Sequence, residues 1–257
     1  MLVFRLQNIL KFSFYITWCE IRDGFSRNRL GTLWNSLGHF AAVGLLGVFF
    51  GSILKSDVGS YENYLSFLGM GLFVWIFISQ SINESCSLFV TNASALRHTS
   101  QPFFAFILKP VLKNLLIFIQ NIVLGIVIYF FATDGIEIKF LPLCIGILIV
   151  FGVVLSLCSI LAIACIRFRD LPQLVSWIIH VSFFLTPIIW MEHFLGRFIY
   201  LVELNPAYYL ISIVRQPTLG TTPDSILWLT SIFMLVVGAS LATYIYSRTV
   251  HKLPYWL

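Results

Sequence analysis

Six stretches of this sequence are each long enough and apolar enough to cross a lipid bilayer as a helix. A spanning helix needs about 20 mainly apolar residues, because an unpaired backbone group inside the hydrocarbon is costly. Charged residues make up only 11% of the chain, against about a quarter in soluble domains. We therefore predict an all-α integral membrane protein, a single domain over residues 1–257 with six transmembrane helices in 31–257. The predicted spans cover residues 32–54, 63–83, 114–132, 140–166, 172–190 and 226–246.

Six spans place both ends of the chain on one side of the membrane, and the basic residues indicate which side. Lys and Arg concentrate in loops that face the cytoplasm. Of the 16 Lys and Arg residues, twelve fall in the inner segments of this topology, and the outer segments hold Lys55, Lys139, Arg197 and Arg215. We therefore expect both termini in the cytoplasm. Because no basic cluster forms on a soluble module, the net charge of +5 indicates membrane orientation rather than binding to nucleic acid.

Two regions outside the spans have apolar patterns of their own. In residues 1–30, apolar side chains recur at steps of three or four, which predicts an amphipathic helix lying in the inner membrane interface. These side chains include Val3, Leu6, Leu10, Phe14 and Trp18. Between the fifth and sixth spans, the apolar pieces 194–204 and 207–214 are too short to cross, so we expect short interfacial or re-entrant helices on the outer side.

The stretch CIRFRDLPQL, residues 165–174, places three charges between two apolar spans. Each of Arg167, Arg169 and Asp170 would cost about 3 kcal/mol at the bilayer centre, so we predict a tight cytoplasmic turn. Asp170 is expected to cap the first amides of the next helix, and Pro172 to lie in its first turn. Two interpretations stay open: the turn only sets the topology, or it also contacts a partner.

The sequence lacks the motifs of an energy source or an enzyme. The phosphate-binding pattern G-x-x-x-x-G-K-[ST] is absent, so the chain is not a P-loop ATPase by itself. The H-E-x-x-H and Gly-x-Ser-x-Gly patterns are also absent, and the five cysteines have no metal-ligand spacing. His39, Glu84 and His180 are too few to form a proton relay through the membrane. We therefore expect no catalytic residue, no metal and no cofactor on this chain.

Five stretches carry a family resemblance when they are read in order. The first three are RNRLGTLWNSL, GLFVWIFISQSINESC and LKNLLIFIQNIVLGIVI. The other two are RFRDLPQLVSWIIHVSFFLTPIIW and LNPAYYLISIVRQPTLG. Each resembles a segment at the corresponding place in the membrane (permease) subunits of ABC-2 type transporters, most closely the branch that exports polysaccharides such as O-antigen, capsule or teichoic acid. The resemblance covers nearly the whole chain.

This resemblance implies a homodimer in the bacterial inner membrane, joined by two copies of a cytoplasmic ATPase subunit that binds ATP and Mg²⁺. The substrate would be a lipid-linked polysaccharide, as in lipopolysaccharide biosynthesis. The resemblance also implies that the loop 85–113 carries a coupling helix, and that the amino-terminal helix and the charged turn contact the ATPase with it. The residues implied in ATPase coupling are Glu20, Arg27, Leu96, Arg97, His98, Arg167, Arg169 and Asp170.

A hydrated polymer cannot cross hydrocarbon, so such a dimer must enclose a lumen with hydrogen-bonding groups and flat apolar faces for sugar rings. The candidate residues for this substrate path are Phe73, Trp75, Phe77, Asn83, Asn121, Phe183 and Phe184. Each aromatic has an alternative interpretation, because most aromatics in a membrane protein face lipid or pack between helices. Pro187 in the predicted fifth span removes one backbone hydrogen bond and is a candidate hinge.

Three other functions stay open. An ABC-2 exporter of lipids or small amphiphiles would share the same motifs. A membrane-embedded glycosyl or acyl transferase is less compatible, since the spans end without paired carboxylates or a His/Asp cluster. An assembly partner in a larger complex is the third.

Overall fold

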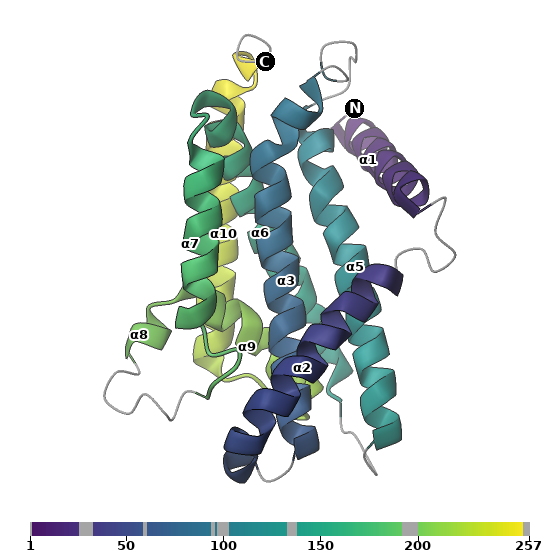
Figure 1. The fold of residues 1–257 in the computed structure, drawn as a ribbon. Coiled ribbons are helices and arrows are strands. Elements are labelled where there is room, and N and C mark those ends of the chain that lie inside the picture. Colours follow the sequence, from purple (N-terminus) through teal and green to yellow (C-terminus); the bar gives the residue numbers. More distant parts are fainter. Residues whose placement is uncertain are drawn as a thin grey trace.

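The computed structural model describes residues 2–25, 33–58, 61–93, 96, 103–132, 138–191 and 200–253, and the regular structure among them is helical throughout. Its long helices are α1 (Leu2–Phe25), α2 (Leu33–Val58), α3 (Tyr61–Thr91), α5 (Phe103–Ala132), α6 (Phe140–Arg167) and α10 (Ser225–Thr249). Its shorter helices are α7 (Leu171–Leu185), α8 (Tyr200–Glu203) and α9 (Pro206–Thr218). Both ends of the chain lie at one end of the bundle (Figure 1), which we call the α1 end; the opposite one is the far end.

Among the described residues, five helices are long and apolar enough to cross a membrane, so the chain is a multi-pass membrane protein. Each of them contains most of one predicted span. Their apolar segments are Leu33–Gly51, Tyr64–Thr91, Phe103–Ile128, Phe140–Arg167 and Ser225–Thr249.

The predicted span 172–190 is shorter in the structure than the sequence indicated. Helix α7 is apolar but has 15 residues and ends at Leu185. Its length of about 22 Å falls short of the roughly 30 Å of hydrocarbon in a bilayer. The cause is Pro187, whose ring excludes the helical conformation from the residue before it. Thr186 accordingly has an extended backbone, with φ −96° and ψ 133°. Helix length therefore leaves the sixth predicted span unconfirmed.

The predicted inner loop 85–113 is largely helical, which corrects its boundaries. Helix α3 continues to Thr91, and α5 already begins at Phe103. The start of α5 buries Phe106, Ile107 and Leu108, and this burial stabilises helix where the sequence had indicated a loop. Pro110 lies inside α5 and does not end it.

Helix α3 is the central element of the bundle. It contacts α2, α5, α6, α7 and α9, and 67% of its apolar segment is buried, against 17% for α2 and for α10. Its fully buried large side chains include Tyr64, Leu68, Phe77 and Phe89. Helices α2 and α10 therefore present wide apolar faces to the outside of the chain.

Helix α9 packs closely on α6 near the far end. The contact is at Gly146, where an added Cβ would lie 2.8 Å from the backbone oxygen of Ile213. Only glycine fits this approach without a shift of the backbone. The sequence 207–214, predicted as a short outer helix, is thus part of α9 and is mostly buried.

Candidate functional site: a polar cavity beside helix α1

A cavity of about 670 Å³ lies among α1, α2, α3 and α5, and its lining is strongly polar for a membrane protein. Three charged side chains line it, namely Glu20, Glu84 and Lys113. Four amide side chains do so as well, namely Asn35, Gln80, Asn83 and Asn114. We call it the polar cavity. It brings together two residues that the sequence had assigned to different roles, Glu20 to ATPase coupling and Asn83 to the substrate path.

Two lysines of α5 hold the carboxylates beside this cavity. Lys109 Nζ lies 2.8 Å from Glu20 Oε2 and donates to Asn92 Oδ1 at 3.2 Å. Lys113 Nζ lies 2.6 Å from Glu84 Oε2 and 3.5 Å from Glu20 Oε1. Lys113 therefore joins carboxylates from α1 and α3, and the charges of the network balance.

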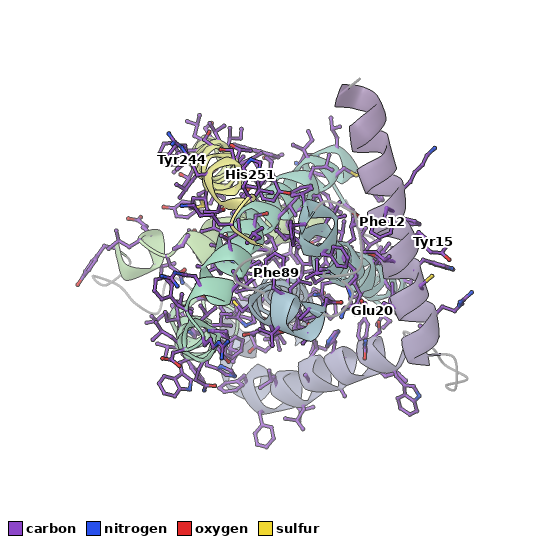
Figure 2. The ribbon with its side chains drawn as sticks, turned by 90° about the horizontal axis from the view of Figure 1, so that it is seen from above. Phe12, Tyr15, Glu20, Phe89, Tyr244 and His251 are labelled. Atoms are coloured by element: carbon purple, nitrogen blue, oxygen red, sulfur yellow. The ribbon has the colours of Figure 1, made fainter. Side chains whose placement is uncertain are left out.

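Helix α1 is also fastened to α5 by uncharged contacts. Ser13 Oγ donates to the Ala105 oxygen at 3.2 Å, and Phe12 packs on Phe106 with ring centroids 6.2 Å apart. Viewed from above, Glu20 points to the bundle and Tyr15 away from it (Figure 2). Helix α1 thus has one face on the bundle and one face directed outward.

The lysines keep Glu20 ionised. Partial burial raises the pKa of Glu20, but the hydrogen bond and charge of Lys109, with those of Lys113, outweigh burial and leave the pKa below its usual value of 4.5. A carboxylate at this position is therefore negative throughout the neutral pH range.

A second polar network joins α2 to α5 next to the cavity. Asn121 Oδ1 accepts from Ser36 Oγ at 2.6 Å, and Ser36 Oγ in turn accepts from Gln120 Nε2 at 2.8 Å. Asn121 Nδ2 lies 2.9 Å from His39 Nδ1, and His39 also lines the polar cavity. Because Nδ2 is a donor, this arrangement assigns the His39 proton to Nε2.

Asn114 contrasts with Asn121, although both belong to α5. Its side chain is 2% exposed, and neither Oδ1 nor Nδ2 has a hydrogen-bond partner among the described residues. Buried amides in proteins are nearly always paired, so this one is an exception that calls for an explanation.

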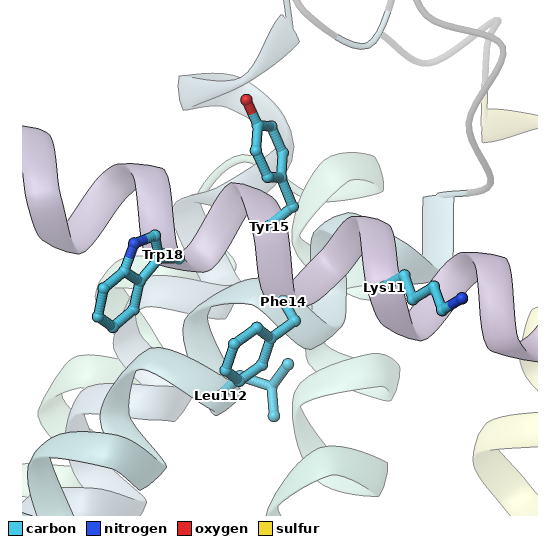
Figure 3. Close-up of a pocket in the computed structure, with 5 residues that line it drawn as sticks. All are labelled: Lys11, Phe14, Tyr15, Trp18 and Leu112. Carbon is cyan, nitrogen blue, oxygen red and sulfur yellow. The ribbon is translucent and has the colours of Figure 1, made fainter.

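The outward face of α1 carries a shallow groove of about 670 Å³ (Figure 3). Phe14, Tyr15 and Trp18 line it together with Lys11 and Leu112. The three aromatic side chains are more than half exposed. This combination of exposed aromatic rings and a basic residue is typical of a helix at the level of lipid headgroups.

The predicted ATPase-coupling residues are only partly described. Arg27, Arg97 and His98 lie outside the described residues. Leu96 is buried in an apolar cluster with Leu88 and Phe89. Glu20 lies in the ion-pair network, and the turn with Arg167 and Arg169 is exposed between α6 and α7.

One local prediction at this turn is confirmed and one is wrong. Pro172 lies in the first turn of α7, as expected. Asp170 stands directly before α7, but its side chain makes no capping hydrogen bond. Its backbone is helical, with φ −87° and ψ −16°, whereas a capping side chain requires an extended backbone at that position.

The predicted path aromatics lie in two different environments. Phe73 and Phe77 are buried within the chain, against Phe40 and Phe118, with ring centroids 5.1 and 5.2 Å apart. Trp75 packs beside Phe183, which is half-buried, and Phe184 is 72% exposed. Within one chain, the rings of Phe73 and Phe77 therefore pack between helices. This is the alternative to a place in the substrate path that the sequence had left open.

The structure places Pro187 after the end of α7 rather than inside a helix. Its oxygen accepts a hydrogen bond from Arg215 Nη1 at 2.8 Å. Arg215 is 4% exposed, and its guanidinium lies 3.9 Å from the ring centroid of Phe67. Helices α3 and α9 thus hold this turn between them, and the hinge stays a prediction.

Two further hydrogen bonds fix the same turn. Asn205 Nδ2 donates to Thr186 Oγ1 at 2.8 Å while Asn205 Oδ1 caps α9 through the Ala207 amide. The Tyr64 hydroxyl donates to the Ile189 oxygen at 3.0 Å. Movement at the turn would have to break these bonds or carry α3 and α9 with it.

Sequence reasoning missed Lys113 and Asn114, which line the cavity, and Lys109 and Ser36, which belong to the polar networks beside it. A usable signal was present, because α5 carries Asn114 and Asn121 seven residues apart, on one helix face inside an apolar stretch.

Within the described ranges, no group of three or more His, Cys, Asp and Glu side chains converges as metal ligands do.

A bundle of apolar helices with a charged, amide-lined cavity is typical of a membrane transport protein. Comparison with known proteins identifies the family within this class. The pattern of the ABC-2 type transporter family matches residues 14–219, so the chain belongs to that family and is a transport subunit. It is similar to a Klebsiella pneumoniae protein named O-antigen export system permease protein RfbA, with 27% identity over 236 residues, 88% of each chain. A second Klebsiella pneumoniae protein of that name is 24% identical over 238 residues, again 88% of each chain.

Proposed function

We propose that this chain is the membrane-spanning subunit of an ATP-driven exporter that moves a polysaccharide, lipid-linked as in O-antigen export, across the bacterial inner membrane. The observation that carries the proposal is the alignment of 88% of the chain with two proteins named as O-antigen export permeases. The polar cavity agrees with it, because a hydrated substrate needs hydrogen-bonding groups where the surrounding helices are apolar.

ATP hydrolysis in this proposal belongs to a separate subunit, present in two copies, which binds ATP and Mg²⁺. The exposed turn of Arg167, Arg169 and Asp170 would contact that subunit together with the region around Leu96. Family membership supports this division of labour, since ABC-2 permeases are the membrane components of ATP-driven transporters.

The orientation that we propose places the α1 end in the cytoplasm. Helix α6 ends and α10 begins at opposite ends of the bundle (Figure 1), so the chain must return between them. We propose that α7, with the turn that follows, supplies this sixth crossing. The positive-inside rule then favours cytoplasmic termini, and the aromatic groove of α1 would lie at the inner headgroup level.

Two copies of the chain would enclose the lumen for the polymer. The outward apolar faces of α2 and α7 support this arrangement, because Trp34, Phe49 and Phe184 are exposed on them. In such a dimer, Phe184 is the predicted path residue best placed to meet the substrate, since Phe73 and Phe77 are enclosed by their own chain.

The experiment is deletion of the gene in its own host, followed by measurement of polysaccharide at the cell surface and inside the cell. We expect surface polysaccharide to disappear and lipid-linked polymer to accumulate inside, with both restored by the wild-type gene. Unchanged surface polysaccharide in the deletion strain would refute the proposal.

A further inference from the structure

We propose that the polar cavity is a binding site for an uncharged, hydroxyl-rich sugar residue. This inference rests on the proposed polysaccharide function and names the chemistry of one site along the path. At about 670 Å³, the cavity lies within the usual range for ligand pockets, about 300–1,000 Å³.

The charge balance of the cavity argues for a neutral ligand. Both lysines beside it already contact carboxylates, Lys109 that of Glu20 and Lys113 those of Glu20 and Glu84. Among the described charged groups at the cavity, a phosphate or other anion would meet these two carboxylates without a surplus of positive charge, and each carboxylate would repel it. Hydroxyl groups both donate and accept, so they can bond to carboxylates, ammonium groups and amides alike.

The uncharged lining has the two kinds of group that a sugar ring requires. Asn35, Gln80 and Asn83 offer amide donors and acceptors from α2 and α3. Trp34 also lines the cavity, and this residue is 55% exposed. A broad aromatic face can cover the apolar face of a sugar while the amides bond to its edge.

Asn114 supplies an independent observation. Its amide is buried beside the cavity and has no partner in the part of the chain that the structure describes, whereas Asn121, two turns further along α5, is paired with Ser36 and His39. Among the described residues, one amide is therefore satisfied within the chain, and the other is left open to a ligand. If its side chain turned toward the cavity, a sugar hydroxyl could bond to the oxygen of Asn114, and a ring oxygen or second hydroxyl to its nitrogen.

The direct test measures protection of the cavity from a thiol reagent. The variant Gly38→Cys places the thiol at a lining position where an added Cβ meets nothing within 4 Å. It is made in a chain whose two more accessible cysteines, Cys19 and Cys144, are replaced by serine. The complex of this permease with its ATPase is placed in lipid nanodiscs and labelled with a maleimide. One arm adds the host polysaccharide after its release from lipid; the other adds a polyprenyl diphosphate without sugar.

We expect the released polysaccharide to slow labelling and the polyprenyl diphosphate to have no effect. Asn114→Leu should weaken the protection roughly three- to tenfold, the effect of one lost hydrogen bond. The same substitution should leave the melting temperature unchanged or raise it, because it removes an unpaired buried amide. A merely structural role for Asn114 predicts the opposite shift, and Asn121→Leu serves as the control that lowers the melting temperature.

Three results would overturn this inference: protection by the diphosphate alone, no protection by either compound, or a lower melting temperature for Asn114→Leu with unchanged protection. None of these affects the proposed function, which is tested separately by export from cells carrying the wild-type gene. If the wild-type gene did not restore polysaccharide export, the proposed function itself would be refuted.

Discussion

Lys113 contacts carboxylates on two helices that are far apart in the sequence, Glu20 on α1 and Glu84 on α3. No local pattern predicts such a cluster, since pairing across 93 positions depends on how α1 lies against α5. The sequence did single out Glu20, through the family resemblance, but it could not name the lysines that hold it. Individual ion pairs of this exposure contribute about 0–1 kcal/mol each, so the network positions α1 more than it stabilises the fold.

The pKa of Glu20 predicts how the docking of α1 depends on pH. The pKa is lowered in the folded protein, so the contribution of Glu20 to stability is fully present above its usual value of 4.5. It is lost as pH falls through the lowered folded value. We expect a fluorophore attached at Tyr15→Cys to report loosening of α1 below pH 4.5. Glu20→Gln should abolish this step, and an unchanged step in that variant would contradict the assignment.

Asn121 gives a second prediction for a single residue. Asn121→Leu leaves Ser36 and His39 without their shared partner, and unpaired buried groups cost about 1–3 kcal/mol. Thermal unfolding followed by circular dichroism should show a lower melting temperature. Asn121→Asp, which keeps the acceptor for Ser36, should lose less than Asn121→Leu, and equal losses would argue against the network.

The elements show where sequence patterns succeed and where they fail. Apolar length predicted α2, α3, α5, α6 and α10, because hydrocarbon imposes a length on every spanning helix. The same criterion overestimated α7, since apolar residues continue past Pro187 while the helix does not. Hydropathy also gave no signal for the burial of α9, which depends on close contact with α6.

The contact between α6 and α9 yields a prediction with a matched control. In Gly146→Ala, the new Cβ would lie 2.8 Å from the Ile213 oxygen, and overpacking of this kind costs about 1–3 kcal/mol. Gly44→Ala adds the same atom in a helix where nothing lies within 4 Å. We expect only the first variant to melt at a lower temperature, and similar melting of the two would disprove the contact.

Arg215 tests how the turn after α7 is held. Arg215→Met keeps much of the side-chain volume but removes the hydrogen bond to the Pro187 oxygen and the charge over Phe67. Because hydrogen bonds from charged groups contribute about 1.5–3 kcal/mol, we expect local loosening of the turn. Hydrogen exchange of residues 186–191 should become faster while exchange in α5 stays the same.

At the scale of the whole molecule, the described part of the α1 end holds the ion pairs of Lys109 and Lys113, and the turn after α7 is held by Arg215 and uncharged hydrogen bonds. The positive-inside pattern predicts that the α1 end faces the cytoplasm, and this orientation stays a prediction. The polar cavity could not be predicted, since its lining comes from four helices whose mutual positions depend on the complete packing.

The exposed turn between α6 and α7 provides a test of the assembly. Reversing Arg167 and Arg169 to glutamate should leave the permease folded, because both side chains are exposed. If the turn contacts the ATPase, the yield of copurified ATPase should fall about tenfold or more, the scale of a few lost contact groups. Lys252→Glu, an exposed charge change at the same end, is the control and should retain the partner.

Because Lys113 pairs with both Glu20 and Glu84, the net charge beside the polar cavity depends on whether α1 is docked. If α1 detached, Glu20 would leave with it, Lys113 would keep Glu84, and Lys109 would keep only the neutral Asn92. The opening exposed in this way would carry an excess positive charge that the docked state lacks. With α1 docked, the charged groups beside the cavity are balanced; with α1 detached, they would carry a net positive charge and would attract anions.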